Sequence, residues 1–596
     1  MKIDSTLKAS AVVIAIFAAI FIWYSNSFFM RKRKKEIALY SMMGIKKKQI
    51  GRMLFYENIA MGAIALIIGI LVGNLFSKVF VMLLVNLMGF STSIKFTIIP
   101  KAIIKTLITF AILFLITSIH GYTIIYRFKL IDLFKAENKG EKEPKASIII
   151  ALLSIILIGS GYILYLNSFK TDFLFAIFTT LALVVIGTYL FFSSFTVFMV
   201  QLARKNKRKY YKGINMIGTS QLLYRIKASS RTLATIAVLS ATTLTAMGIT
   251  SSIYYDFQTK LNIRYPFTYV IGNTNDTLNS KIEDTISKYP KNKIINSVDA
   301  AFININALLP NVSKINTKSK TIKNNIHMIS ESKFNEIAKA RGLKEIVKLN
   351  NSNESILFYE NFIKGFMKSY IDKNIEINDN GKKSSLKVID FKPYALLNNY
   401  TLVDETLVVK DDVYNKYYNS KNVYRVKAYV TDNKKDSKNL TNSIRKIVGR
   451  KTFLKDKPWI STFSSYYESY SSGLMINGLL IFIGSFLGLV FLLSTGSIIF
   501  FKQLSEANDD KSRYTILKNI GVSKKEIKAS ISRQMLVVFV LPLLLGILHS
   551  LVATSILSKL LNLNLLIPIT ISVISYTIIY MIYYVLTVNS YYKLVS

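Results

Sequence analysis

Nine long hydrophobic stretches alternate with short charged segments along the chain. Each is about 20 residues or longer, which is the length at which an α-helix crosses the hydrocarbon core of a bilayer. The pattern therefore predicts nine membrane-spanning helices, and Pro542 inside the eighth predicts a kink there. The stretches cover roughly residues 9–30, 58–77, 106–126, 146–169, 173–200, 232–254, 472–500, 535–557 and 566–590.

One long region has no such stretch and shows a different pattern. In residues 278–286 apolar side chains recur at helical spacing, whereas in residues 424–430 apolar and polar side chains alternate as they do along a half-buried strand. We therefore predict three parts, which are a first membrane block at 1–254, a mixed α/β domain at 255–470 and a second membrane block at 471–596.

The charges of the short connections predict the orientation. Lysine and arginine are concentrated between spans one and two, five and six, and seven and eight, so these loops are expected inside the cell. Alternation then places residues 255–470 and the amino terminus outside, and the carboxyl terminus inside.

An external amino terminus with only two lysines before the first span is a poor start for membrane insertion. We therefore expect an earlier transmembrane helix that this chain lacks. A cleaved signal peptide is the alternative, although the basic run RKRKKE follows the first span directly, with no small-residue cleavage site.

Composition narrows the functional classes. The net charge of +43 does not indicate a nucleic acid partner, because the membrane divides it and the positive-inside rule accounts for much of it. The chain has no cysteine, which excludes disulfides and thiolate chemistry.

A short segment occurs twice, 477 residues apart, as KEIALYSMMGIKKKQI at 35–50 and SRYTILKNIGVSKKEI at 512–527. Each copy follows one span and precedes another, so the repeat marks equivalent points in two halves. The pattern predicts a helix, a glycine stop and a second helix. Ser523 and Glu526 have the spacing of a capping box, of which Lys46 and Gln49 supply half.

These repeated elements resemble the cytoplasmic motif of FtsX-like permeases, the membrane subunits of ATP-binding-cassette (ABC) systems. The segment YRFKLIDLFKAENKGEKEPK at 126–145, the segment at 501–527 and the large domain between the second-half spans are similar to the bacitracin-resistance (BceB-type) permeases. Members of this type have ten spans, so the resemblance implies that the first is missing here. It also implies a bacterial cell membrane protein, polytopic and α-helical, with one large extracellular α/β domain.

The resemblance further implies resistance to, and sensing of, cell-wall-targeting antimicrobial peptides. The chain has no GxxxxGK[ST] loop, so it is not expected to be an enzyme, and ATP and Mg²⁺ would bind a partner ATPase dimer. A sensor histidine kinase and the peptide, or its lipid pyrophosphate complex, are the other implied partners. The alternative is a mechanotransmission permease of the FtsX or lipoprotein-release type; a receptor without an ATPase, or an enzyme acting on lipids, is the third hypothesis.

The repeated elements are the candidate ATPase-coupling site. The lysines would meet acidic rims on the ATPase, and Ile37, Tyr40, Ile516 and Ile520 would supply apolar contact. The alternative is that these lysines only contact lipid headgroups. The candidate residues are Glu36, Ile37, Tyr40, Gly44, Lys46, Lys47, Gln49, Arg513, Ile516, Ile520, Gly521, Ser523, Lys524, Lys525 and Glu526.

Other polar residues carry weaker signals. The three histidines, His120, His327 and His549, are scattered and are expected to pack between helices or in the domain rather than to bind a metal. Glu57 is either paired with a lysine or a functional carboxylate in the membrane. The acidic run Glu506, Asp509 and Asp510 is either a partner contact or a solvated turn. Glycines in the spans are expected to permit close helix packing, namely Gly62, Gly69, Gly73, Gly473, Gly478, Gly484 and Gly488.

Overall fold

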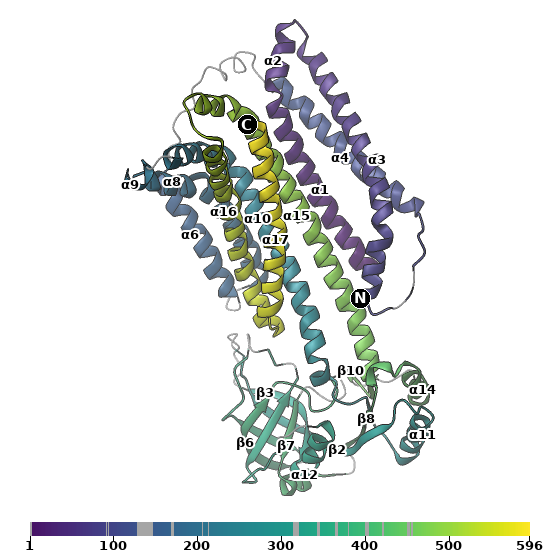
Figure 1. Ribbon diagram of the computed structural model, residues 1–596. Coiled ribbons are helices and arrows are strands. Elements are labelled where there is room, and N and C mark those ends of the chain that lie inside the picture. The colour runs from purple at the N-terminus through teal and green to yellow at the C-terminus, as the bar shows by residue number, and fades with distance from the viewer. Residues whose placement is uncertain are drawn as a thin grey trace.

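The structure is a computed structural model with one helical block and one sheet domain (Figure 1). It describes residues 3–90, 92, 94–127, 147–168, 172–205, 207–211, 214–313, 321–342, 346–360, 362–363, 367–379, 381–399, 405–419, 422–449, 453–454 and 457–595.

Within this described part of the chain, nine helices are long and apolar enough to cross a membrane, which confirms the predicted spans. Several continue well beyond the hydrophobic stretches, and the eighth stays one helix through Pro542. The helices are α1 (Ile3–Lys32), α3 (Lys47–Leu87), α4 (Pro100–Arg127), α6 (Ile148–Leu166), α7 (Phe173–Leu190), which continues through a π-helical turn (Phe191–Phe195) into α8 (Thr196–Lys205), α10 (Ile214–Arg264), α15 (Tyr466–Asn519), α16 (Lys524–Leu561) and α17 (Leu566–Val595).

The long helices form two groups that meet at α15. One group consists of α1, α3 and α4. In the other, α10 packs against α15, α16 and α17, and α7 packs on both α6 and α10. The two groups join where α15 contacts α1 and α3. The sheet domain lies at one end of the helices, which we call the sheet end, and the amino terminus lies toward that end (Figure 1). The carboxyl terminus and the short helix α2 (Lys34–Met42) lie at the opposite end.

Glycines allow the closest of these contacts. A β-carbon at Gly478 would meet the backbone of Leu87 on α3, and one at Gly484 would meet Thr250 on α10. Gly62, Gly473 and Gly488 are similarly covered, so the expectation of close packing is correct for these positions. It is wrong for Gly69 and Gly73, which face open space among the described atoms.

The sheet domain contains nine strands in the order β11-β1-β8-β2-β3-β7-β4-β6-β5. Because β5 also pairs with β2, six of them close into a ring from β2 back to β2. The pairs β3–β7 and β4–β6 are parallel and the others are antiparallel. The strands are β1 (Tyr269–Gly272), β2 (Ile294–Pro310), β3 (Thr321–Ser330), β4 (Glu354–Tyr359), β5 (Asn374–Asp379), β6 (Lys382–Lys392), β7 (Glu405–Val409), β8 (Val423–Thr431) and β11 (Phe463–Ser465), with a separate hairpin of β9 (Phe453–Leu454) and β10 (Lys457–Ser461).

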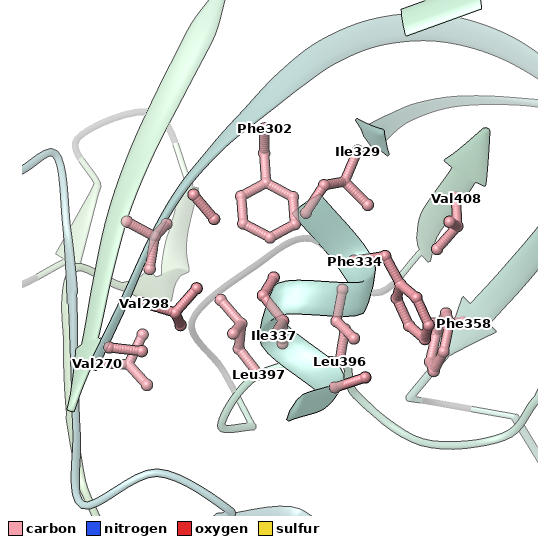
Figure 2. Close-up of a cluster of buried hydrophobic side chains, with 14 of the residues drawn as sticks. Val270, Val298, Phe302, Ile329, Phe334, Ile337, Phe358, Leu396, Leu397 and Val408 are labelled. Carbon is pink, nitrogen blue, oxygen red and sulfur yellow. The ribbon is translucent and has the colours of Figure 1, made fainter. Parts of the chain in front are cut away.

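Three buried clusters stabilise this domain. One gathers side chains of the ring strands, such as Ile305 and Leu407. A second is built around α12 (Glu331–Arg341), where Phe334 of this helix lies beside Phe358 and where Phe302 belongs to the same cluster (Figure 2). The third cluster joins the sheet to two helices, α11 (Asp276–Ser287) and α14 (Lys438–Val448). α11 covers the predicted helical stretch. A further helix, α13 (Asp411–Tyr417), packs on the ring.

Two long helices lead directly into neighbouring strands of this sheet. α10 ends at Arg264 shortly before β1, and α15 begins at the residue after β11. β1 and β11 pair with each other in antiparallel register, with Tyr269 opposite Ser465. The side chain of Asn398 accepts from the backbone N–H of Phe267 and donates to its carbonyl, at 3.0 Å each. Both backbone polar groups of Phe267 at this junction are therefore hydrogen-bonded, as a buried backbone requires.

Two adjacent residues of β2, one buried and one exposed, allow a test of which strand residues form the core of the ring. Ile305 is buried inside the domain and Asn306 is exposed. We expect Ile305→Asp to destabilise the domain by at least about 3 kcal/mol, because a carboxylate would replace a buried aliphatic group, whereas Asn306→Asp should cost within about 0.5 kcal/mol. Limited proteolysis of the purified full chain measures this. Equal protease resistance of the two variants would contradict the assignment of Ile305 to the core.

Candidate coupling site

Both repeated segments form a sharp turn at the end of the helices opposite the sheet domain, which we call the turn end (Figure 1). Gly44 follows α2 with φ +86°, and Gly521 follows α15 with φ +93°. This left-handed region is one that other residues adopt only at a cost, so glycine is the natural residue at both positions. The predicted order of helix, glycine stop and second helix is confirmed in each copy.

The hydrogen bonds of the two turns correspond one to one. The N–H of Ile45 donates to the carbonyl of Tyr40 at 3.1 Å, and the N–H of Val522 donates to that of Leu517 at 3.1 Å. The N–H of each glycine donates to the carbonyl three residues earlier. This pattern is the Schellman motif, which satisfies the last carbonyls of a helix. The same backbone geometry is thus built twice.

The helices that follow begin with the predicted caps. Ser523 Oγ accepts from the backbone N–H of Glu526, whose carboxylate accepts from the N–H of Ser523 at 3.0 Å, which completes the capping box. At Lys46 only half is present, because Gln49 Oε1 accepts from the Lys46 N–H at 3.1 Å while a lysine side chain has no acceptor to return. The capping box is therefore complete after the second turn and half-formed after the first.

Each turn rests on a small buried core with the same plan. Ile37 and Ile50 are buried together with Met30 and Leu54. The residues 477 positions later, Ala507, Tyr514, Ile527 and Ile531, are buried together in the second half. The prediction that Ile37 contacts a partner is therefore wrong, because its side chain is 3% exposed and packs within the chain. Tyr40 is half-buried against the same cluster.

The exposed apolar residues of the turns lie on the neighbouring helical face. Ile516 and Ile520 are 61% and 70% exposed, as their predicted contact role requires. In the first copy the equivalent residues are Leu39 and Met43, which are 57% and 71% exposed and are not among the predicted contact residues. Counting 477 residues back from Ile516 and Ile520 would have found them.

The charged candidates have three different placements. Lys46, Lys524 and Lys525 are exposed at the starts of α3 and α16, and Lys47 is half-exposed. Glu36 lies 3.2 Å from Arg33 Nε, and Arg513 lies 3.1 Å from Asp510, so these two side chains are engaged within the chain. Gln49, Ser523 and Glu526 act in the helix caps. The structure thus brings the lysines and the exposed apolar pair together at each turn.

A buried ion cluster lies behind the second turn. Arg225 on α10, whose side chain is 4% exposed, lies with Nη2 2.9 Å from Asp510 Oδ2 and with Nε 3.5 Å from Glu506 Oε2 on α15. Tyr591 on α17 donates to Asp510 at 2.7 Å, and Ser229 donates to Glu506 at 2.6 Å. The cluster therefore joins three helices at the turn end.

All three residues of the acidic run lie within α15, so the interpretation as a solvated turn is wrong. Glu506 and Asp510 are 13% exposed and pair with Arg225, so for these two the interpretation as a partner contact is also wrong. Asp509 is exposed, and for it the partner contact stays a prediction. Sequence reasoning could not find Arg225, because about 280 residues separate it from its partners.

Glu57 pairs within the chain, as one interpretation predicted, although with an arginine rather than a lysine. Its Oε2 lies 2.7 Å from Arg33 Nη1. Counting 477 residues forward, Arg33 corresponds to Asp510 and Glu57 to Gln534. The two halves thus use different polar residues at the same two places.

The histidines lie in three separate environments. His549 on α16 is hydrogen-bonded to Tyr162 at 2.5 Å and to Thr188 at 2.9 Å. His120 stacks on Trp23, and His327 is buried in the sheet domain. Among the described residues, no group of three or more His, Cys, Asp or Glu side chains is placed to hold a metal ion. Most of the segment 126–145, which carried part of the family resemblance, lies outside the described residues.

Comparisons with known proteins match the two halves separately. Residues 8–130 and 474–592 match the family model of the FtsX-like permease C-terminal domain, and each match contains one glycine turn. The chain is 28% identical over 601 residues to the uncharacterized ABC transporter permease YvcS of Bacillus subtilis, a similarity that covers 99% of this chain and 90% of that protein. It is 24% identical to the bacitracin export permease protein BceB of Bacillus subtilis, over 100% of this chain and 92% of BceB. The BceB of Halalkalibacterium halodurans gives the same identity and coverage. The predicted resemblance is therefore confirmed.

Removing Arg225 should reveal how much the ion cluster contributes. Arg225→Gln removes the buried guanidinium and leaves Glu506 with Lys502 at 3.1 Å and Asp510 with Arg513 at 3.1 Å, so we expect it to destabilise the helical block by about 3 kcal/mol, the low end for a broken buried ion pair. The triple variant Arg225→Met, Glu506→Gln and Asp510→Asn removes the three charges that meet at Arg225 and leaves Lys502 and Arg513, which are 15% and 51% exposed, to solvent; it should recover most of that loss. Thermal unfolding in detergent compares the variants. If Arg225→Gln unfolds at the same temperature as the native chain, the cluster does not contribute the expected stability.

Proposed function

We propose that this chain, an ABC transporter permease of the FtsX type and a multi-pass cell membrane protein, protects a bacterium from cell-wall-targeting antimicrobial peptides. In this proposal the turn end faces the cytoplasm and binds an ABC ATPase dimer, which holds ATP and Mg²⁺. The sheet domain is extracellular and engages the peptide or its lipid pyrophosphate complex. A sensor histidine kinase, implied by the family resemblance, would read the same engagement.

The continuity of α15 is the observation that carries this proposal. The helix has 54 residues, so at 1.5 Å per residue it is about 80 Å long, far longer than the roughly 30 Å hydrocarbon core. It begins at β11 in the sheet domain and ends at the Gly521 turn. A movement imposed at the turn can therefore reach the sheet without crossing a flexible linker.

α10 adds a second connection of the same kind. It has 51 residues, packs along α15 and leads into β1, which pairs with β11. Because the Arg225 cluster fastens α10 to α15 at the turn end, the two helices transmit displacement or rotation together. Because β1 and β11 are paired at the other end of these helices, their joint movement would reorient the sheet.

The two turns offer matched surfaces to a dimeric ATPase. Each presents an exposed apolar pair, Leu39 with Met43 or Ile516 with Ile520, beside exposed lysines. Apolar side chains with a charged rim are typical of protein interfaces. Two equivalent surfaces on one chain suit the two equivalent subunits of a dimer.

The choice of peptide antibiotics rests on the relatives. Two of them are named bacitracin export permeases, and the similarity extends through the sheet domain because it covers the whole of this chain. A protein that acts on a peptide outside the membrane needs an external surface and an energy source inside. In this proposal the sheet domain supplies the external surface, and the turns bind the ATPase that supplies the energy.

The turn glycines test the coupling. Gly44→Val and Gly521→Val each force a β-branched residue into the left-handed region, at a cost of about 1–2 kcal/mol, while no neighbouring atom lies near either position. We expect the double variant to insert normally but to recover less ATPase subunit on co-purification and to lose resistance. Gly44→Asn and Gly521→Asn are the matched control, because asparagine tolerates this backbone. Equal recovery of the ATPase by the Val and Asn variants would contradict the coupling role.

Excision of the sheet domain tests the external role. The backbone N–H of Gly272 donates to the carbonyl of Thr462 at 2.8 Å, so a two-residue Asn-Gly turn can join these strands in place of residues 273–461. We expect this variant to keep its ATPase subunit, because the turns are untouched, and to lose protection against bacitracin-like peptides. Growth inhibition of cells carrying the variant or the full chain measures this. Unchanged protection would overturn the proposal in favour of a permease that drives another external partner.

A further inference from the structure

The six-stranded ring of the sheet domain has two ends, and they differ in what surrounds them. β4 and β6 are parallel and finish together at one end, with Phe358 opposite Lys392, and β7 begins there. We call this the near end of the ring. The opposite end, which we call the far end, carries α13, whose Lys416 donates to Ser384 near the start of β6 at 3.0 Å.

A cavity places the near end beside the membrane-spanning part of α15. Glu360, which follows β4, lines a space of about 360 Å³ together with Phe257 on α10 and Gly473 on α15. Gly473 belongs to the hydrophobic stretch at 472–500. The near end therefore lies next to the point at which the apolar part of α15 begins.

The hydrogen bonds of α10 give the same level. Lys260 Nζ donates to the carbonyl of Asn562 at 2.9 Å, in the connection where α16 ends and α17 begins. Four residues further along α10, or about 6 Å, the carbonyl of Arg264 accepts from the backbone N–H of Asn399 at 3.0 Å. Asn399 belongs to the segment that leaves the near end after β6. This segment is thus joined to α10 only about one helical turn beyond the ends of α16 and α17.

Aromatic side chains gather at the near end. The ring of Tyr359, at the end of β4, lies 6.1 Å from that of Tyr370 between centroids. Phe391 on β6 lies 5.6 Å from Tyr370 and 4.8 Å from Phe362. Tyr370 is buried, whereas the other three are half-buried. The aromatic row therefore leads from the interior of the ring to its surface.

Exposed aliphatic side chains lie beside this row. Ile371 is 45% exposed, and Ile389 on β6 is 39% exposed. The two positions are neighbours, because the backbone N–H of Asp372 donates to the carbonyl of Val388 at 2.9 Å. The near end thus presents apolar groups that the domain itself does not bury.

Two exposed lysines complete a surface that we call the near-end patch. It consists of Phe362, Lys368, Ile371, Lys373 and Ile389. Aromatic and aliphatic side chains flanked by lysines are typical of surfaces at the boundary between hydrocarbon and water, where lysine meets lipid phosphate.

The position of the ring indicates what covers the patch. The strands β3 and β6 extend sideways from the end of α10, away from α15 (Figure 1). Among the described residues, the ring strands have no extensive packing against α6, α7, α16 or α17. At the level fixed by Gly473 and Asn562, the surface that remains for the patch is that of the bilayer beside these helices.

We infer that the near-end patch rests on the lipid surface, with Phe362, Ile371 and Ile389 at headgroup level and the two lysines beside lipid phosphates. The contact holds the sheet domain against the bilayer. A joint movement of α10 and α15 that reorients the sheet would then lift the patch from the lipid. The inference concerns the position of the domain and does not depend on which ligand the domain engages.

Fluorescence quenching by lipid tests this contact in the full chain, with one copy in each lipid nanodisc. Because the native chain has no cysteine, a single introduced cysteine carries the only fluorophore. Ile371→Cys places it in the patch. Tyr418→Cys is the matched control, because Tyr418 follows α13 at the far end and is 47% exposed.

Lipids brominated in the upper part of their acyl chains quench a fluorophore that reaches the boundary. Since interfacial side chains lie about 5–10 Å into the headgroup region, we expect at least about a twofold loss of fluorescence at Ile371→Cys, relative to ordinary lipid. The fluorescence at Tyr418→Cys should be the same in both lipids.

A charge placed in the patch distinguishes contact from proximity. The fluorophore is attached at Lys368→Cys, and Ile371→Asp is added in the same chain. Because a carboxylate resists transfer out of water, we expect the quenching to become at least about twofold weaker. Tyr418→Asp is the control and should leave the quenching at Lys368→Cys unchanged.

Several results would overturn the inference. Equal fluorescence of Ile371→Cys in the two lipids would show that the patch faces water. Equal quenching of Ile371→Cys and Tyr418→Cys would show that lipid does not select the near end. Undiminished quenching after Ile371→Asp would show that the patch lies near lipid without resting on it. A fluorophore at Ile371→Cys that ignores bromination but responds to added bacitracin would make the patch a peptide-binding surface instead.

Discussion

The packing of α10 against α15 and α16 is the contact on which the rest of the structure depends. It is close because Gly484 and Gly488 on α15 and Gly546 on α16 have no side chain and are each covered by α10. In a bilayer, where apolar surface gains little by leaving lipid, such close packing is a principal source of helix association. The Arg225 cluster fixes the register of the same contact at the turn end, and the β1–β11 pair fixes it at the sheet end.

The two halves of the helical block share one backbone plan but differ in their polar contacts and in their connection to the sheet domain. Both halves contain a Schellman turn at glycine, a buried core beneath it and an exposed apolar pair beside lysines. In the second half α10 contributes Arg225 to the acidic residues of α15, whereas in the first half Arg33 and Glu57 satisfy each other. The second half is thereby tied to the sheet domain, because α10 and α15 lead into β1 and β11.

This asymmetry fits the proposed function. An ATPase dimer would move both turns in a similar way, but among the described helices that end at a turn it is α15, at the second turn, that reaches the sheet. The first half would then act as the fixed support against which α15 moves, since α15 contacts α1 and α3.

The sequence by itself determined the features that depend on neighbours along the chain. Hydrophobic length gave the nine spans, and the glycine with its flanking residues gave both turns and the full and half capping boxes, because these are set within a few residues. Helical periodicity placed Ile37 and Tyr40 on one face, yet it could not show that this face is buried against α3. The Arg225 cluster, the closure of β5 onto β2 and the unequal surroundings of Gly69 and Gly546 were decided only by the tertiary structure. Each of these joins segments that are far apart in the sequence, and no local pattern records which of them meet.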